Sequence, residues 1–384
     1  MLHHIAAVGG SLAKRYIEVV EVNDPNSNPG GSRPPASGDE AVIALLPLAV
    51  YVITAIFFIF PFIGVYYTAH TVFPTLAMIE DPNPPPGYTP VPLDTQEDSA
   101  PSGEFEVVEA NPKPITSSLH ATHRLLWTWR REGYFQGLGC ALITVFCTVV
   151  LAAFITVYTF LPHFVGSFIA TVLLTQLSTV WVHIVITPPS ARPWYSRILP
   201  FRYVFKATAL PLLAHWAASV AAIEIPRLLA FILGLPVNLD QNSDSNSDSP
   251  SDPNMDLPLS MLLLKGIPVA ALTILLYLFV VIPTQVILVR VQASLLPPTE
   301  DAIVPFDRSF KGKLDPAVLG GGSETFLTMR DALTTFGREG WSRLVKMYLK
   351  VFGVTVAFHM VVMATFALES GIIYSIYWLT TPRQ

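Results

Sequence analysis

Charge is scarce in this chain. Only 13% of its 384 residues are charged and 52% are hydrophobic, whereas a soluble domain carries about 25% charged residues. The apolar residues gather in six long runs, at residues 41–69, 137–161, 165–187, 208–235, 259–289 and 349–379. Each run reaches the roughly 20 residues that a helix needs to cross a bilayer. Buried helices of a large soluble protein are the alternative, but such helices keep a polar stripe, and these runs are apolar almost all round. We therefore predict an all-α membrane protein with six transmembrane helices.

Cysteine is equally scarce. Cys140 and Cys147 are the only two, and both fall within the second apolar run. A separation of seven residues places them on one face of a helix, where they cannot bridge each other. We expect small packing residues here, with no disulfide and no metal site.

The motifs of catalysis and cofactor binding are missing as well. The sequence has no phosphate-binding loop, no cluster of metal ligands, no nucleophile elbow and no haem motif. It also lacks the basic stripe of a nucleic-acid-binding protein. We therefore expect no enzyme activity, no cofactor, no metal and no nucleic-acid partner.

The ends and loops differ from the apolar runs in composition. Residues 1–40 hold no stretch long enough for a signal peptide and are rich in Pro, Gly, Ser and Asn towards their end, which predicts a disordered tail. Residues 41–384 form the predicted membrane domain. Within it, residues 237–257 form an acidic loop of low complexity.

Positive charge is concentrated on one side of the predicted helices. Most Lys and Arg residues fall in or beside the links between runs 1 and 2, 3 and 4, and 5 and 6. We call the side of these links the basic side. Positive residues mark the side that is not translocated, so both termini are predicted to lie on the opposite side.

The alternation of links suggests three helix pairs, at residues 41–162, 163–236 and 258–384. Arg-Glu-Gly recurs at 131–133 and 338–340, each time before an apolar run, and the Gly is expected to end a short surface helix. The even runs also end alike, because Thr159 follows Gln136 by the same 23 residues that separate Glu369 from Lys346. Chance alignment of apolar runs is the alternative.

The end of the fifth run carries a more specific pattern. Pro283 is followed by Gln285 and then by Arg290 and Gln292. This spacing resembles the signature that ends the odd-numbered helices of mitochondrial carriers. The resemblance implies three tandem helix pairs around a central path, a mitochondrial membrane (inner or outer) and transport of a small solute.

Several charges of that family are missing. Gln285 stands where the family has an acid and Leu288 where it has a base, and the segments after Pro61 and Pro188 lack both. In the family these charges form salt bridges that close the path on the matrix side. The sequence therefore predicts a matrix-side gate with little electrostatic closing energy.

Ionisable groups inside a membrane are costly and usually functional. The resemblance and this rule together give the candidates for a cavity or gate, which are His183, His215, Glu224, Arg227, Gln285, Arg290, His359 and Glu369. For the histidines the alternative is a neutral, hydrogen-bonded side chain. For Glu224 and Arg227 it is a pair at the end of a helix. For Arg290 it is contact with lipid phosphate or with helix-end carbonyls.

Two functions are consistent with these patterns, and in both the protein is in contact with the lipid bilayer. The first is solute transport by alternating access. The second is a carrier-derived scaffold or adaptor that binds a protein partner through loops 70–124 and 299–325 and does not transport. A six-helix protein unrelated to the carriers is a third interpretation.

Overall fold

The computed structural model describes residues 38–81, 114–128, 135–190, 193–235, 259–314 and 326–380. Every regular element within these ranges is a helix. Five helices are long and apolar enough to cross a membrane, and a sixth span is formed if the bent pair His163–Leu173 and Thr175–Ile186 counts as one. The predicted all-helical architecture is confirmed, and the chain is an integral membrane protein.

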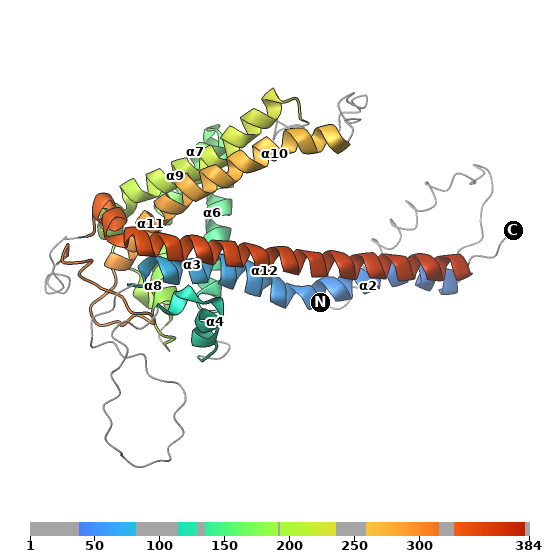
Figure 1. Cartoon of the computed structure of the whole chain (residues 1–384), viewed down its shortest axis with the longest axis horizontal. Helices are drawn as coiled ribbons and strands as arrows, with labels where there is room; N and C mark the ends of the chain where they lie inside the picture. The colour runs from blue at the N-terminus through green and yellow to red at the C-terminus, as the bar shows by residue number, and fades with distance from the viewer. Residues whose placement is uncertain are drawn as a thin grey trace, which may run out of the picture. The chain divides into compact units, whose positions relative to one another are not determined.

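The elements follow one another in chain order (Figure 1). They are α2 (Gly38–Ile63), the π-helix η1 (Gly64–Val72), α3 (Phe73–Ile79), the 3-10 helix η2 (Ile115–Ser117), α4 (Leu119–Thr128), α6 (Leu138–Thr159), α7 (His163–Leu173), α8 (Thr175–Ile186), the 3-10 helix η3 (Trp194–Arg197), α9 (Phe201–Ile232), α10 (Leu259–Leu276), the π-helix η4 (Tyr277–Val281), α11 (Ile282–Ser294) and α12 (Met329–Thr380).

The first, third and fifth spans are broken. The first passes from α2 through η1 into α3, and the fifth from α10 through η4 into α11. The third bends by 59° between α7 and α8. Pro74 and Pro283 stand in the first turns of α3 and α11, directly after the π-helices η1 and η4, and proline has no N–H to continue the hydrogen-bond pattern of the preceding helix.

This geometry corrects the predicted end of the first run. The run does not end at residue 69, because Pro74 begins a new helical segment instead of ending the span. Residues 70–79 of the predicted link are therefore helical. Pro74 occupies the position that Pro283 has in the fifth span, whereas Pro61 lies inside α2 and Pro188 lies beyond α8.

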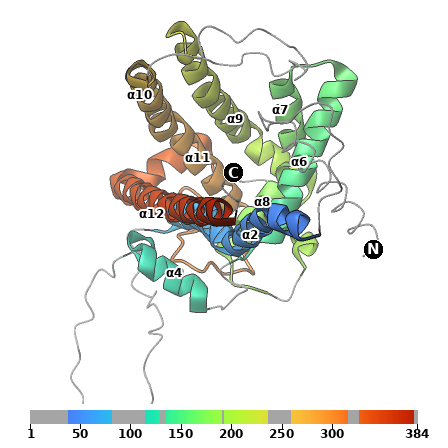
Figure 2. The same cartoon turned by 90° about the vertical axis from the view of Figure 1, so that its right-hand side faces the viewer.

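The chain divides into two compact units. In the first, the described residues are 38–66 and 352–380, and α2 runs beside the C-terminal part of α12 (Figures 1 and 2). Tyr51 Oη lies 3.0 Å from Ser370 Oγ, and the rings of Phe58 and Phe358 meet edge to face. The division into two units is based on contacts and does not test whether the helices form three repeated pairs, so that pairing stays a prediction.

The second unit comprises residues 67–351. Its centre is the set of segments that follow the breaks, since α3, α8 and α11 pack against one another pairwise. We call these three segments the helix junction. From it α6 extends beside α7, and α9 extends beside α10 (Figure 2).

The start of α12 differs from the prediction by three residues. The surface helix from Met329 ends at Gly337, whose φ of 69° and ψ of 170° interrupt the helix, and not at Gly340. Such a backbone conformation is open essentially to glycine alone. The matching Arg-Glu-Gly at 131–133, the acidic loop 237–257 and all but residues 38–40 of the predicted tail lie outside the described residues.

Candidate functional site

The helix junction is closed by apolar side chains. All seven residues of α3 are buried, and five of them share one core with residues of α8 and α11. Leu76, Ile186 and Val286, one from each segment, have no accessible surface. The junction therefore leaves no open path between its three helices.

A buried ion pair ties α12 to the end of α3. Glu80 Oε2 lies 3.6 Å from Arg343 Nη1, and the two side chains are 0% and 6% exposed. The same carboxylate accepts the backbone N–H of Ile115 and Thr116, at 2.6 and 3.0 Å. Arg343 Nη2 donates to the carbonyls of Ala77 and Glu80. A charged pair thus joins the first span, the last span and the first link.

Arg290 forms a second buried contact at the same end. Its Nη1 donates to the carbonyl of Met78 at 3.0 Å, and its Nη2 donates to Thr335 Oγ1 at 2.8 Å. Its guanidinium carbon lies 5.0 Å from the ring centre of Phe310 and 5.4 Å from that of Phe336, within the range of a cation–π contact. Arg290 therefore contacts a carbonyl at the end of a helix, as in the alternative to a cavity or gate role.

The other candidates in this unit mostly bridge neighbouring helices. The buried His183 ring lies 2.9 Å, through Nε2, from the carbonyl of Gln292 and links α8 to α11. Gln285 Oε1 accepts from the hydroxyl of Tyr348. The ring of His215 on α9 lies 3.2 Å from Thr284 Oγ1. His183 and His215 thus agree with the alternative interpretation, in which each histidine is a hydrogen-bonded side chain.

The remaining candidates form local pairs. Glu224 and Arg227 lie 3.8 Å apart on α9, with the Glu224 side chain 58% exposed. In the first unit, His359 Nε2 lies 2.7 Å from the hydroxyl of Tyr66, and Glu369 accepts a hydrogen bond from Thr54. Each of these residues is paired within its own unit.

The sequence-based interpretation did not single out the buried charged pair at the end of the junction. It predicted little electrostatic closing energy, because Gln285 and Leu288 are uncharged. The structure places a buried pair, Glu80 and Arg343, at the junction, outside the two signature positions on which that expectation rests. The acid directly after the end of α3 was the available signal, and the misplaced end of the first run concealed it.

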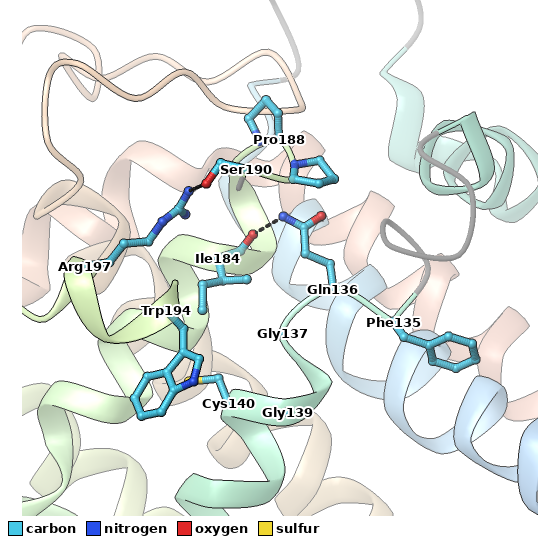
Figure 3. A pocket seen from close by; sticks show the side chains of 11 residues that line it. Phe135, Gln136, Gly137, Gly139, Cys140, Ile184, Pro188, Ser190, Trp194 and Arg197 are labelled. Carbon is cyan, nitrogen blue, oxygen red and sulfur yellow. Dashed lines mark hydrogen bonds between the residues drawn. The ribbon is translucent and has the colours of Figure 1, made fainter. Parts of the chain in front are cut away.

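A pocket of about 350 Å³ lies beside the junction, at the start of α6 (Figure 3). Gln136 Nε2 donates to the carbonyls of Ile184 and Thr187, at 2.5 and 2.6 Å, while its buried Oε1 has no partner in the described structure. Arg197 donates to Ser190 Oγ on the facing wall. The polar side chains of the pocket therefore bond mainly to neighbouring parts of the chain, and they fix the start of α6 against the end of α8.

Asp307 organises the turn that lies against Arg290. Its Oδ1 accepts from the backbone N–H and the hydroxyl of Ser309, and its Oδ2 accepts from the N–H of Lys311. Burial by itself would raise the pKa of Asp307. The hydrogen bonds and the positive charge of Arg290 outweigh it, so the pKa lies below its ordinary value of 3.8.

This lowered pKa predicts a pH-dependent difference between the wild type and Asp307→Asn. A lowered folded-state pKa stabilises the fold above the unfolded value of 3.8, and this contribution is lost as the pH falls through the folded pKa. The wild type is expected to be the more stable protein at pH 6, with the difference shrinking below pH 4. Thermal unfolding in micelles between pH 3 and 6 measures it, and a constant difference would contradict the assignment.

Comparison with known proteins gives no relative. No family model, curated protein or solved structure matches the chain. Its function is therefore inferred from its own residues.

Proposed function

We propose that the chain moves a small solute across a membrane by alternating access, as a divergent relative of the mitochondrial carriers. The helix junction is the observation that carries this proposal. Three broken spans end in short segments that pack pairwise, and such packing is suited to closing one end of a path while the other end is open. The proposed mitochondrial membrane rests on the signature-like segment from Pro283 to Gln292.

The helix breaks support the proposal because they supply hinges. The π-helix η4 separates α10 from α11, and the bend at Leu174 separates α7 from α8, so each break divides an outer helix from a segment of the junction. π-helical segments occur frequently at functional sites. In the proposed cycle, α8 and α11 move apart about these breaks, while the helices on either side keep their backbone hydrogen bonds.

Polar groups just beyond η4 are the proposed contacts for the solute. Gln285 is half-buried and accepts a hydrogen bond from the hydroxyl of Tyr348. One residue earlier, Thr284 lies 3.2 Å from the half-buried His215. Together they offer amide, hydroxyl and imidazole groups near a hinge, where a bound solute would bias the position of the junction.

Uptake into liposomes tests the transport function. Purified protein is reconstituted with a panel of nucleotides, carboxylates and amino acids, and uptake or exchange of at least one member is expected. Gln285→Ala should lower that rate by about ten-fold, the effect of losing one hydrogen bond of about 1.4 kcal/mol. Thr273→Val is the matched control, because this threonine is exposed on α10 and bonds only the carbonyl of Val269 in its own helix. Folded protein that moves no member of the panel would contradict the proposal.

The buried charges at the junction favour a second candidate, the scaffold without transport. The Glu80–Arg343 pair is almost fully desolvated, and separating such a pair is costly, which suits a chain that stays closed. The proposed partner surface consists of loops 70–124 and 299–325. Residues 70–79 of the first loop are helical, and residues 82–113 and 315–325 lie outside the described ranges. Crosslinking and pull-down that recover a stoichiometric partner, with no uptake, would support this candidate. A monomer without any enriched protein would exclude it.

A further inference from the structure

The link after α11 lies across the end of the helix junction. Its residues 300–314, which we call the cap, bond the ends of two junction helices through the backbone. The N–H of Asp81, just beyond α3, donates to the carbonyl of Pro305 at 2.9 Å. The N–H of Ile303 donates to the carbonyl of Ile186, the last residue of α8, at 2.8 Å. The cap thus connects the ends of two helices, α3 and α8, that are far apart in the chain.

Side chains fix the cap to the third helix. Phe310 is 2% exposed and lies on the guanidinium of Arg290 in α11, 5.0 Å from ring centre to carbon. Leu314 is buried in the same cluster as Phe310, and Val304 is buried in the core of the junction. All three helices of the junction are therefore held at one end by a single segment.

The cap is strained at its anchor. Phe310, Lys311 and Gly312 have φ values of 49°, 59° and 75°. Consecutive residues in the left-handed region are unusual, and this conformation is unfavourable for each one other than glycine. Hydrogen bonds to Asp307 hold this turn in place. The strain is present only while the turn is formed, so it favours release of the cap.

We propose that residues 300–314 are a strained lid, which seals the junction through Phe310 and must lift before the basic side opens. This gives the proposed carrier a built-in control of one of its two openings. The purpose of the lid rests on the proposed function, but its lifting can be measured without transport. Two contributions set the equilibrium between the closed and the lifted lid. The Phe310 contact stabilises the closed lid, and the strained left-handed turn destabilises it.

Labelling of a cysteine beneath the lid tests the proposal. In a Cys140→Ala/Cys147→Ala background, Ser294→Cys is introduced at the end of α11, where Ser294 is 3% exposed and lies against Phe306, Arg308 and Phe310 of the lid. A maleimide then reports exposure of this position in detergent micelles. Phe310→Ala should raise the labelling rate by about ten-fold or more, because it removes a buried anchor. Lys311→Gly should lower the rate by about three-fold, because glycine relieves the left-handed strain of the closed lid.

The opposite signs separate a lid from a merely loosened protein. Ala230→Cys is the control position, because Ala230 is also buried and lies near the far end of α9, and its labelling should not change in either variant. Equal acceleration at both positions would overturn the proposal, as would Lys311→Gly that leaves labelling unchanged or raises it. If Phe310→Ala does not fold, Phe310→Leu and Lys311→Gly give the same comparison. Protein that carries no solute but shows the opposite shifts would refute transport and leave the lid standing.

Discussion

Replacing Arg343 by methionine is expected to lower the unfolding free energy by about 3–5 kcal/mol, the cost of leaving one member of a buried ion pair alone. The carboxylate of Glu80 has no exposed surface, and Arg343 is the cation paired with it. Methionine keeps much of the volume of arginine and removes its charge and its hydrogen bonds to the carbonyls of Ala77 and Glu80. The loss therefore reports the electrostatic role of the pair more than its packing.

A double-mutant cycle isolates the pair from its surroundings. Glu80→Gln combined with Arg343→Met should be less destabilising than the sum of the two single changes, because neither buried charge is left alone. Lys346→Met is the matched control, one turn further along α12 and exposed, and it should change stability by no more than about 0.5 kcal/mol. Unfolding in mixed micelles measures the stability of the wild type, the two single variants, the double variant and the control. Losses that simply add would mean that the pair does not hold the junction.

Gly337→Ala is expected to cost about 1–3 kcal/mol through the backbone alone. Gly337 has φ 69° and ψ 170° at the break in α12. A methyl group there would meet only the flexible end of Lys311, at 3.8 Å. Steric overlap is therefore small, and the loss reports the cost of a conformation that L-residues rarely adopt.

Gly353→Ala provides the comparison on the same helix. A Cβ at Gly353 meets nothing within 4 Å, and the residue lies within the helical part of α12. This change should be neutral or stabilise the protein by up to about 1 kcal/mol, because alanine favours the helix. Thermal unfolding of the two variants under one condition measures the difference. Equal stability would show that the break at Gly337 is not required by the fold.

The sequence predicted the spans well, because transmembrane helices are defined by long apolar runs. Their ends were harder to place. His70 and Pro74 interrupt the first run, and a proline usually marks the end of a helix. Here Pro74 stands in the first turn of a new segment after a π-helix, so the span continues to Ile79. Whether a proline ends a span or only breaks it depends on the packing around it, which hydropathy does not report.

The site was less predictable because its contacts are tertiary. The motif directed attention to Gln285 and Leu288, where charges are missing, and away from Glu80 and Arg343, which lie 263 residues apart in the chain and meet only in the folded protein. His183 and Arg290 were singled out because they are polar groups inside apolar runs. Their partners, a carbonyl of α11 for His183 and a carbonyl of α3 for Arg290, depend on how the three segments pack.

Accessibility along α11 is the most direct test of a junction closed on the basic side. Single cysteines replace Gln285 and Gln292 in a cysteine-free background, and oriented liposomes are treated with an impermeant maleimide from each side in turn. Gln285 is half-buried and follows the break, whereas Gln292 is 2% exposed within the junction. We expect slow labelling of both positions from the basic side, and faster labelling of position 285 from the opposite side. Rapid labelling of position 292 from the basic side, with position 285 protected from both sides, would contradict the closed junction.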